Sequence, residues 1–209
     1  MNILENWTSG STEHRESFVI PDGCQDIIFV QKPNDAPFVY LSPLYNTTIK
    51  VELAANTFMM GFRLHPGCNV RDMDSRGLLS SISSVGALTD QIEGLTHTDD
   101  RVSEALACIR SNGQTIEFCA KQLGVSTRTL QRLLSAHTSG TPSYWLRLAR
   151  ARQCAKELVN SGLHNEIAYQ YHYADQAHMC REIKHWFGVT PSQLLKREDL
   201  TEQLFWPAY

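Results

Sequence analysis

The stretch IAYQYHYADQAHMCREIKHWF, residues 167–187, decides the fold of the second half of the chain. It predicts a short helix, a tight turn and a second helix, because Asp175 is a favourable N-cap and apolar residues recur after it at helical spacing. Ala168 is small enough to let the two helices cross closely, and Met179 and Ile183 lie on the face that packs. The stretch therefore has the pattern of a helix-turn-helix unit.

The same pattern occurs about fifty residues earlier, in TIEFCAKQLGVSTRTLQRLL, residues 115–134. Ala120 takes the small-residue position, Gly124 falls where the turn needs a positive φ, and Ser126 caps the second helix. Leu130 lies on the side that packs back on the first helix. The sequence therefore predicts two helix-turn-helix units.

A linker helix is predicted between the two units, in PSYWLRLARARQCAKELVNSG, residues 142–162. Pro142 stands at its start and Gly162 just past its end, positions that suit these residue types. Helical periodicity divides it into an apolar face and a basic side. The apolar face holds Trp145, Leu148, Ala151, Ala155 and Leu158, while Arg147, Arg150 and Lys156 lie largely off it.

Charge is distributed unevenly along the chain. The formal net charge is −3, from 19 Lys and Arg and 22 Asp and Glu. Residues 1–99 hold 6 basic and 12 acidic side chains, whereas residues 121–184 hold 9 basic and 4 acidic ones. This asymmetry predicts an acidic module joined to one that approaches phosphate.

Exposed positions early in each second helix carry side chains that can read base edges. In a helix-turn-helix this part of the helix enters the major groove, where arginine binds guanine and glutamine binds adenine. One such face alone is more often merely solvated, but two sets joined by a basic helix favour DNA binding. The first set is Ser126, Arg128, Thr129, Gln131 and Arg132, and the second is Asp175, Gln176, Ala177, His178, Arg181 and Lys184.

Residues 101–197 resemble the double helix-turn-helix DNA-binding domain of the AraC/XylS family of bacterial transcription regulators. The most specific stretch, residues 167–194, keeps an aromatic residue after the turn (Tyr173), Phe187-Gly188 and Thr190-Pro191. The resemblance implies two recognition helices reaching successive major grooves, ~34 Å apart, and activation more often than repression. It places base contacts at Arg128, Gln131, Arg132, Gln176, Ala177 and Arg181.

Two residues depart from the family pattern in the second unit. The position of the usual turn glycine is occupied by His172, for which a positive φ is accessible only at a cost. Ala177 offers a methyl contact to thymine but no hydrogen bond. The second unit is therefore expected to bind DNA less tightly or less selectively than the first.

The first half of the chain reads as short strands. ESFVI, DIIFV, FVYL, TTIKVEL and TFMMGFRL are rich in β-branched and aromatic residues and are separated by turn residues, which predicts a five-strand meander. An apolar stripe from Leu78 to Ile92 predicts a helix that is either core or a dimer contact. A further helix is expected to begin after Thr98 as its N-cap and to end at Gly113.

Residues 14–30 and 60–68 resemble the short N-terminal domain of a subset of these regulators, with its Pro-Asp-Gly-Cys turn. This resemblance implies effector sensing or dimerisation. Cys24 and Cys68, with His65 close to the second, are either a thiol switch or metal site, or small buried residues at strand ends.

Two aspartates flank Cys24 and are expected to raise the pKa of its thiol, which would blunt its reactivity. Arg63 stands within an otherwise apolar strand. It is expected either to pair with Asp22 or Asp26 or to hold an anionic effector.

Together these patterns predict an α+β protein in three parts. Residues 1–97 are expected to form a small, mainly-β sensor or dimerisation domain with a helical end, and residues 98–198 an all-α domain of two helix-turn-helix units joined by a linker helix. Residues 199–209 are expected to form a tail whose aromatic side chains pack on a neighbouring surface. With no secretory signal and no apolar run of about 18 residues, the expected location is the bacterial cytoplasm, at the nucleoid.

The expected function is that of a sequence-specific transcription regulator, an activator, with no enzyme activity, no cofactor and no metal. The expected partners are double-stranded promoter or operator DNA and RNA polymerase, with a small effector and a second copy of the chain as further candidates, and no membrane. The alternative is a DNA-binding adaptor or antagonist whose N-terminal domain binds a protein partner and senses no effector.

Overall fold

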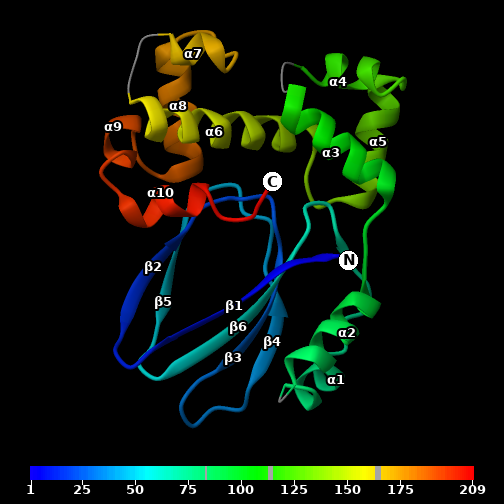
Figure 1. Ribbon diagram of the computed structural model, residues 1–209, viewed down its shortest axis with the longest axis vertical. Helices are drawn as coiled ribbons and strands as arrows, with labels where there is room; N and C mark the ends of the chain where they lie inside the picture. The colour runs from blue at the N-terminus through cyan, green and yellow to red at the C-terminus, as the bar shows by residue number, and fades with distance from the viewer. Residues whose placement is uncertain (83, 113–114, 163–165) are drawn as a thin grey trace.

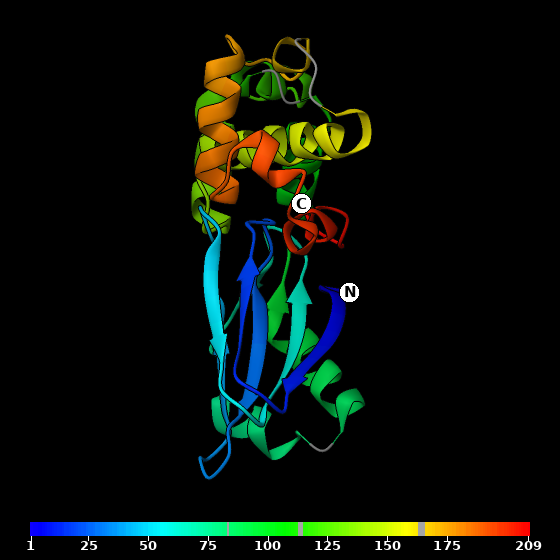
Figure 2. The same cartoon turned by 90° about the vertical axis from the view of Figure 1, so that its left-hand side faces the viewer.

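A computed structural model describes residues 1–82, 84–112, 115–162 and 166–209. A half built of strands and a half built of helices follow one another along the long axis of the molecule (Figure 1). Figure 2, turned by 90°, shows the strands running roughly along this axis. The described strands are β1 (Ile3–Ser11), β2 (Arg15–Val19), β3 (Asp26–Gln31), β4 (Phe38–Leu41), β5 (Ile49–Leu53), β6 (Thr57–Leu64), β7 (Asn69–Val70) and β8 (Thr96–His97).

Long-range pairing organises the strands. Four of them form an antiparallel sheet in the order β1-β6-β3-β4, β2 pairs with β5, and β7 pairs with β8. All five predicted strands are present, but the predicted meander is wrong, because β2 pairs with β5 and β3 pairs with β6, so neighbours in sequence are not neighbours in the sheets. Strand β1 was not predicted, because Trp7 is flanked there by polar residues and gives no clear strand signal.

Two helices cover one face of the four-stranded sheet. They are α1 (Ser75–Ser80) and α2 (Val85–Leu95). Leu78, Leu88 and Ile92 are fully buried and share a core with Ile27 and Phe62 of the sheet. The apolar stripe is therefore core and not a free dimer helix, and it lies on two helices where the sequence predicted one.

The helical half is organised around one long helix. One helical group packs near the start of α6 and another near its end (Figure 1). The apolar face predicted for α6 is buried in this core. The helices are α3 (Asp100–Asn112), α4 (Ile116–Gln122), α5 (Thr127–His137), α6 (Pro142–Ser161), α7 (Ile167–Gln170), α8 (Gln176–Phe187), α9 (Pro191–Leu194) and α10 (Glu198–Leu204).

The start of α3 differs from the prediction by one residue. Asp99, and not Thr98, precedes the helix and accepts a hydrogen bond from the backbone N–H of Arg101 at 2.9 Å. Thr98 instead donates its hydroxyl to the Asn2 side chain at 3.0 Å. Asp is a better N-cap than Thr, which explains the choice. The predicted end at Gly113 lies outside the described residues.

Two glycine turns dock the strand half onto the helical half. Gly23 and Gly67 both have a φ of +79°. A Cβ added at Gly23 would lie 2.5 Å from the Cβ of Tyr209 and 3.0 Å from the Trp145 ring. A Cβ at Gly67 would lie 2.8 Å from the Leu106 side chain on α3. Both turns therefore require glycine for backbone conformation and for close packing.

A buried arginine on α6 joins three parts of the chain. Arg152 is 2% exposed and donates hydrogen bonds to the carbonyl oxygens of Pro21 and Leu204 at 3.0 Å and of Gln203 at 3.4 Å. Burial lowers the pKa of the Arg152 guanidinium, and the charge of Asp22 acts against this shift. These hydrogen bonds of Arg152 were not predicted from the sequence.

The segment beyond residue 198 is an integral part of the fold. Its last residue described, Tyr209, is buried, and its N–H donates to the Asp22 carbonyl at 2.9 Å. The Tyr209 ring packs edge-on against Trp145 at 4.8 Å between centroids. The expected packing on a neighbouring surface therefore holds for Tyr209, whereas Phe205 and Trp206 stay about half exposed, at 52% and 49%.

The turns of the two helix-turn-helix units have different residues at the position with a left-handed backbone conformation. Gly124 has a φ of +66°, and His172 has a φ of +58°. Both are exposed, and a Cβ at Gly124 would meet nothing within 4 Å. The left-handed conformation costs a residue with a side chain about 1–2 kcal/mol. His172 therefore adopts the strained turn that the sequence indicated.

We expect Arg152→Met to lower the free energy of unfolding by about 2–4 kcal/mol, because it leaves three buried carbonyl oxygens without their donor. Urea unfolding followed by circular dichroism measures this change. Lys121→Met, at an exposed position on α4, serves as the control and should change stability by less than about 0.5 kcal/mol. Equal stability of the Arg152 variant and the parent would remove the arginine from the set of residues that hold the halves together.

We expect His172→Gly to raise the free energy of unfolding by up to about 1 kcal/mol, since glycine relieves the left-handed strain but gains freedom in the unfolded chain. The mirror change Gly124→His should lower it by about the same amount. Both are measured by urea unfolding. A clear loss of stability in His172→Gly would contradict the strain argument.

Candidate nucleic-acid interface

Helix α5 is fixed in place by its cap and by one buried face. The Ser126 side chain accepts the backbone N–H of Thr129 at 3.1 Å, as the sequence predicted for this N-cap. Leu130 and Leu134 are buried against the rest of the helical core. The opposite face of α5 is therefore held outward in a defined orientation.

Three predicted side chains form the outward face of α5. Arg128, Gln131 and Arg132 are all exposed. Among the described residues, neither arginine forms a salt bridge, so both guanidinium groups can reach a ligand. Thr129 is exposed as well, but its hydroxyl lies 2.8 Å from that of Ser126. Ser126 and Thr129 therefore have a role in the cap, and the side chains of Arg128, Gln131 and Arg132 are exposed.

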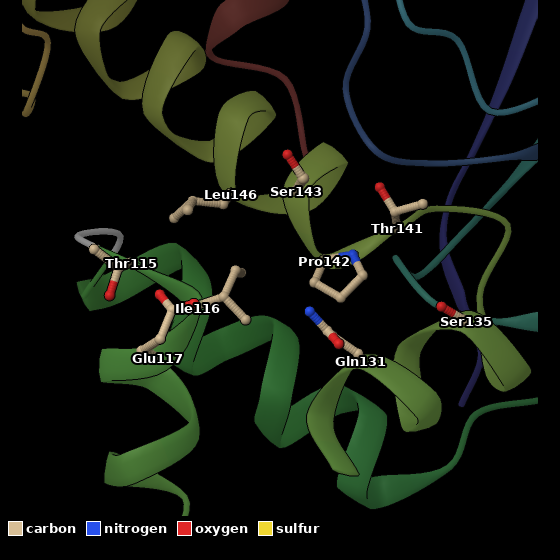
Figure 3. A pocket seen from close by; sticks show the side chains of 9 residues that line it. All are labelled: Thr115, Ile116, Glu117, Gln131, Ser135, Thr141, Pro142, Ser143 and Leu146. Atoms are coloured by element: carbon tan, nitrogen blue, oxygen red, sulfur yellow. The ribbon is translucent and has the colours of Figure 1, made fainter. Parts of the chain in front are cut away.

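A groove of about 500 Å³ lies beside this face (Figure 3). Gln131 and Ser135 of α5 line it, together with the first residues of α4 and of α6. Both helices begin at the groove, behind the N-caps Thr115 and Thr141. Helix N-termini carry partial positive charge and backbone N–H groups that suit phosphate. The groove therefore combines an amide side chain and two helix ends that favour an anion with the carboxylate of Glu117, which opposes one.

Helix α8 presents a second outward face. Asp175 accepts the backbone N–H of His178 at 2.6 Å, as expected for the N-cap. Gln176 and Ala177 are exposed at the first turn of the helix, and Arg181 and Lys184 continue the exposed face by one and two turns. The helix therefore carries amide, methyl and basic groups on its outer side.

His178 is less accessible than the other predicted residues of α8. Its side chain is only partly exposed, and its ring packs edge-on against the buried Tyr173 at 5.3 Å between centroids. Its Nδ1 accepts a long hydrogen bond from the Ala174 N–H at 3.4 Å. His178 therefore supports the turn before α8 more directly than it supports an outer surface.

A bidentate ion pair fixes α8 to α6. Arg147 donates to the Glu182 carboxylate through Nε at 3.0 Å and through its terminal nitrogen at 2.8 Å. Burial acts to raise the pKa of Glu182, but the hydrogen bonds and charge of Arg147 outweigh it and lower that pKa. Arg147 lies off the predicted apolar face of α6, and its ion pair with Glu182 was not predicted from the sequence.

The candidate effector and redox residues of the strand half do not form one site. Arg63 is buried and pairs with Asp22 at 3.3 Å and Asp26 at 3.4 Å. His65 is exposed and lines a small pocket with Cys68 at the junction with the helical half. Arg63 lines a different cavity, between the two sheets.

Both candidate thiols are buried, and their pKa values are shifted upward. Burial raises the pKa of the Cys24 thiol well above its usual value, and the charge of Asp22 adds to this shift. Burial also raises the pKa of the Cys68 thiol. Protonated, buried thiols are poor nucleophiles, so the arrangement favours small buried residues over a thiol switch. Among the described residues no cluster of three or more His, Cys, Asp or Glu could hold a metal ion.

Within the described part of the chain, no helix has both the length and the apolar character needed to cross a bilayer.

Known proteins resemble this chain in sequence. Residues 119–197 match the family described as helix-turn-helix domain. The transcriptional activator RhaS of Escherichia fergusonii is 30% identical over 118 residues, which cover 54% of this chain and 42% of that protein. RhaS of Salmonella arizonae is 29% identical over 119 residues, with the same two shares. The chain thus spans well under half the length of these relatives.

Two solved structures illustrate the structural likeness. An AraC-type regulator from Chromobacterium violaceum aligns with 46% of this chain and 88% of its own, at 20% identity and a TM-score of 0.42. ToxT from Vibrio cholerae aligns with 94% of both chains, at 12% identity and a TM-score of 0.44.

Both sequence relatives are named as transcriptional activators. The family match includes most of α4 and all of α5 to α9, and with them both outward faces described above. Residues 119–197 are therefore similar to a helix-turn-helix domain.

Proposed function

We propose that this protein is a sequence-specific DNA-binding transcription regulator in which α5 and α8 each enter a major groove. The observation that carries the proposal is the pair of outward faces on capped helices, one at each end of α6 (Figure 1). Each face combines arginine with an amide side chain, the groups that recognise guanine and adenine. One such face would be unremarkable, but two on a single rigid support make a bipartite reader.

The length of α6 suits this arrangement. The helix has 20 residues, which at 1.5 Å per residue makes it about 30 Å long. Successive major grooves on one side of the duplex are ~34 Å apart. A support of this length can hold two helices at the spacing that the duplex requires.

The proposed roles follow from exposure and residue type. Arg128, Gln131 and Arg132 read bases in the first groove, and Gln176, Ala177 and Arg181 in the second. Lys184, two turns into α8, contacts phosphate, and the helix ends at the groove beside Gln131 add backbone N–H contacts to phosphate. Ser126 and Asp175 act through the caps, and Thr129 and His178 support the same ends.

The activating role rests on the RhaS relatives, which are named transcriptional activators. An activator bound at a promoter acts on RNA polymerase, which is the partner we propose beside DNA. In this proposal residues 98–198 form the DNA-binding domain, and residues 1–97 provide sensing or dimerisation.

The test of the proposal is a selection of genomic fragments by the purified protein, followed by sequencing. We expect a motif with two short elements about ten base pairs apart, because each recognition helix reads one major groove. Recovery of DNA with no enriched motif would contradict sequence-specific reading. It would favour the adaptor alternative, in which the strand half binds a protein partner.

We expect Arg132→Ala to weaken binding to the selected motif by about 1–3 kcal/mol and to relax selectivity at one base pair, since arginine reads guanine through two hydrogen bonds. Lys184→Ala should weaken binding to all sequences alike and reduce the salt dependence. Fluorescence anisotropy at several salt concentrations measures both. Arg76→Ala, on the exposed side of α1, is the matched control. Equal losses on every sequence for Arg132→Ala would remove it from the base-reading set.

A further inference from the structure

A cavity of about 470 Å³ lies between the four-stranded sheet and the β2–β5 pair. The sheet contributes Trp7, Ile28 and Tyr40, and the strand pair contributes Val51. The segment after α10 contributes Trp206, so this segment completes the wall. A space of this size is in the range that small organic ligands occupy.

The buried arginine of the cavity is already occupied by carboxylates. Arg63 lies 3.1 Å from Glu5, 3.3 Å from Asp22 and 3.4 Å from Asp26, and it also donates to the Pro207 carbonyl at 3.3 Å. Two of these contacts are hydrogen bonds, from Nη1 to Glu5 and to Pro207, while the Arg63 Nε lies near Asp26 without a hydrogen bond. The sequence left two alternatives for Arg63, pairing with an aspartate or binding an anionic effector. The structure supports the pairing.

The charges that line the cavity leave an excess of carboxylate. Glu5, Asp22 and Asp26 face it, against Arg63 and the exposed Arg15. One further cation, Arg152, lies nearby: its charge acts on Asp22, and its hydrogen bonds go to the carbonyl oxygens of Pro21, Gln203 and Leu204.

Two carboxylate oxygens of this cluster remain available. Asp26 accepts the Trp7 indole N–H at 2.8 Å through Oδ1, the oxygen that also faces Arg63. Glu5 faces Arg63 through Oε1. Among the described residues, Asp26 Oδ2 and Glu5 Oε2 have no hydrogen-bond partner, so a ligand cation can use them.

Aromatic rings surround the remaining space. They attract a cation through their faces and bury an apolar body at the same time. Trp7 is held in place by its hydrogen bond to Asp26 and by Gly61 of β6, where any Cβ would overlap the indole ring. The rings that line the cavity are those of Trp7, Phe18, Tyr40, Tyr45 and Trp206.

We propose that this cavity binds a small organic ammonium ion with an apolar body. The ammonium group lies at the carboxylates of Glu5 and Asp26, and the apolar body lies among the aromatic rings, between the two sheets. This site is independent of the DNA-binding proposal, because it involves no residue of α5 or α8.

The test compares three compounds that share one apolar body: 4-phenylbutylamine, 4-phenyl-1-butanol and 4-phenylbutyrate. Isothermal titration calorimetry and thermal unfolding are carried out on the full chain. We expect the amine to bind at least tenfold more tightly than the carboxylate and to raise Tm, with the alcohol between them. Tighter binding of the carboxylate, or binding of none of the three, would overturn the proposal.

Variants locate the site. Ser17→Trp places a large ring in the cavity from β2 and should remove binding of the amine, with folding checked by circular dichroism. Glu5→Gln should weaken the amine about tenfold and leave the alcohol unchanged. Glu16→Gln is the matched control, because Glu16 lies outside the cavity lining and pairs with the exposed Lys50 at 2.6 Å. Equal loss in the Glu5 and Glu16 variants, or full binding in Ser17→Trp, would exclude this cavity as the site.

Discussion

The fold depends on the burial of one guanidinium group at the junction of its two halves. Arg152 is withdrawn from water and is stable there only because three carbonyl oxygens accept its hydrogen bonds. Those oxygens belong to the turn before β3 and to the end of α10, two segments that are distant in sequence. Removal of any acceptor leaves a buried donor unsatisfied, so Arg152 fixes both segments against α6.

Around this contact the strand half is attached to the helical half at several places. The turn at Gly23 packs on Trp145, and the turn at Gly67 packs on α3. Near α8, the N–H of Thr48, just before β5, donates to the Trp186 carbonyl at 3.0 Å. The attachments hold the strand half on the side of α6 that carries α10, and the outward faces of α5 and α8 remain exposed. The strand pair that lines the cavity is thus in direct contact with the end of α8.

The helical half could be predicted because its signals are local. Caps such as Ser126 and Asp175 and the turn at Gly124 act within four residues, so the sequence alone identifies them. Sheet order could not be predicted in this way, because β1 pairs with β6 across 46 to 61 residues. Arg152 lies four residues after Leu148 and therefore on the apolar face of α6, a position that indicates burial. The hydrogen-bond acceptors that make this burial possible are distant in sequence and could not be predicted. The base-reading roles remain predictions, since exposure alone does not test them.

The packing of Tyr209 against the Gly23 turn has a consequence for the order in which the protein is assembled. Residues 22 and 209 are joined by a hydrogen bond, yet they leave the ribosome 187 residues apart. At roughly 5–20 residues per second, synthesis separates them by about 10–40 s. Throughout that interval the first glycine turn lacks its tyrosine, and Arg152 lacks the carbonyls of α10. The contact between the Gly23 turn and Tyr209 can therefore form only after translation of residue 209, however early each half has folded.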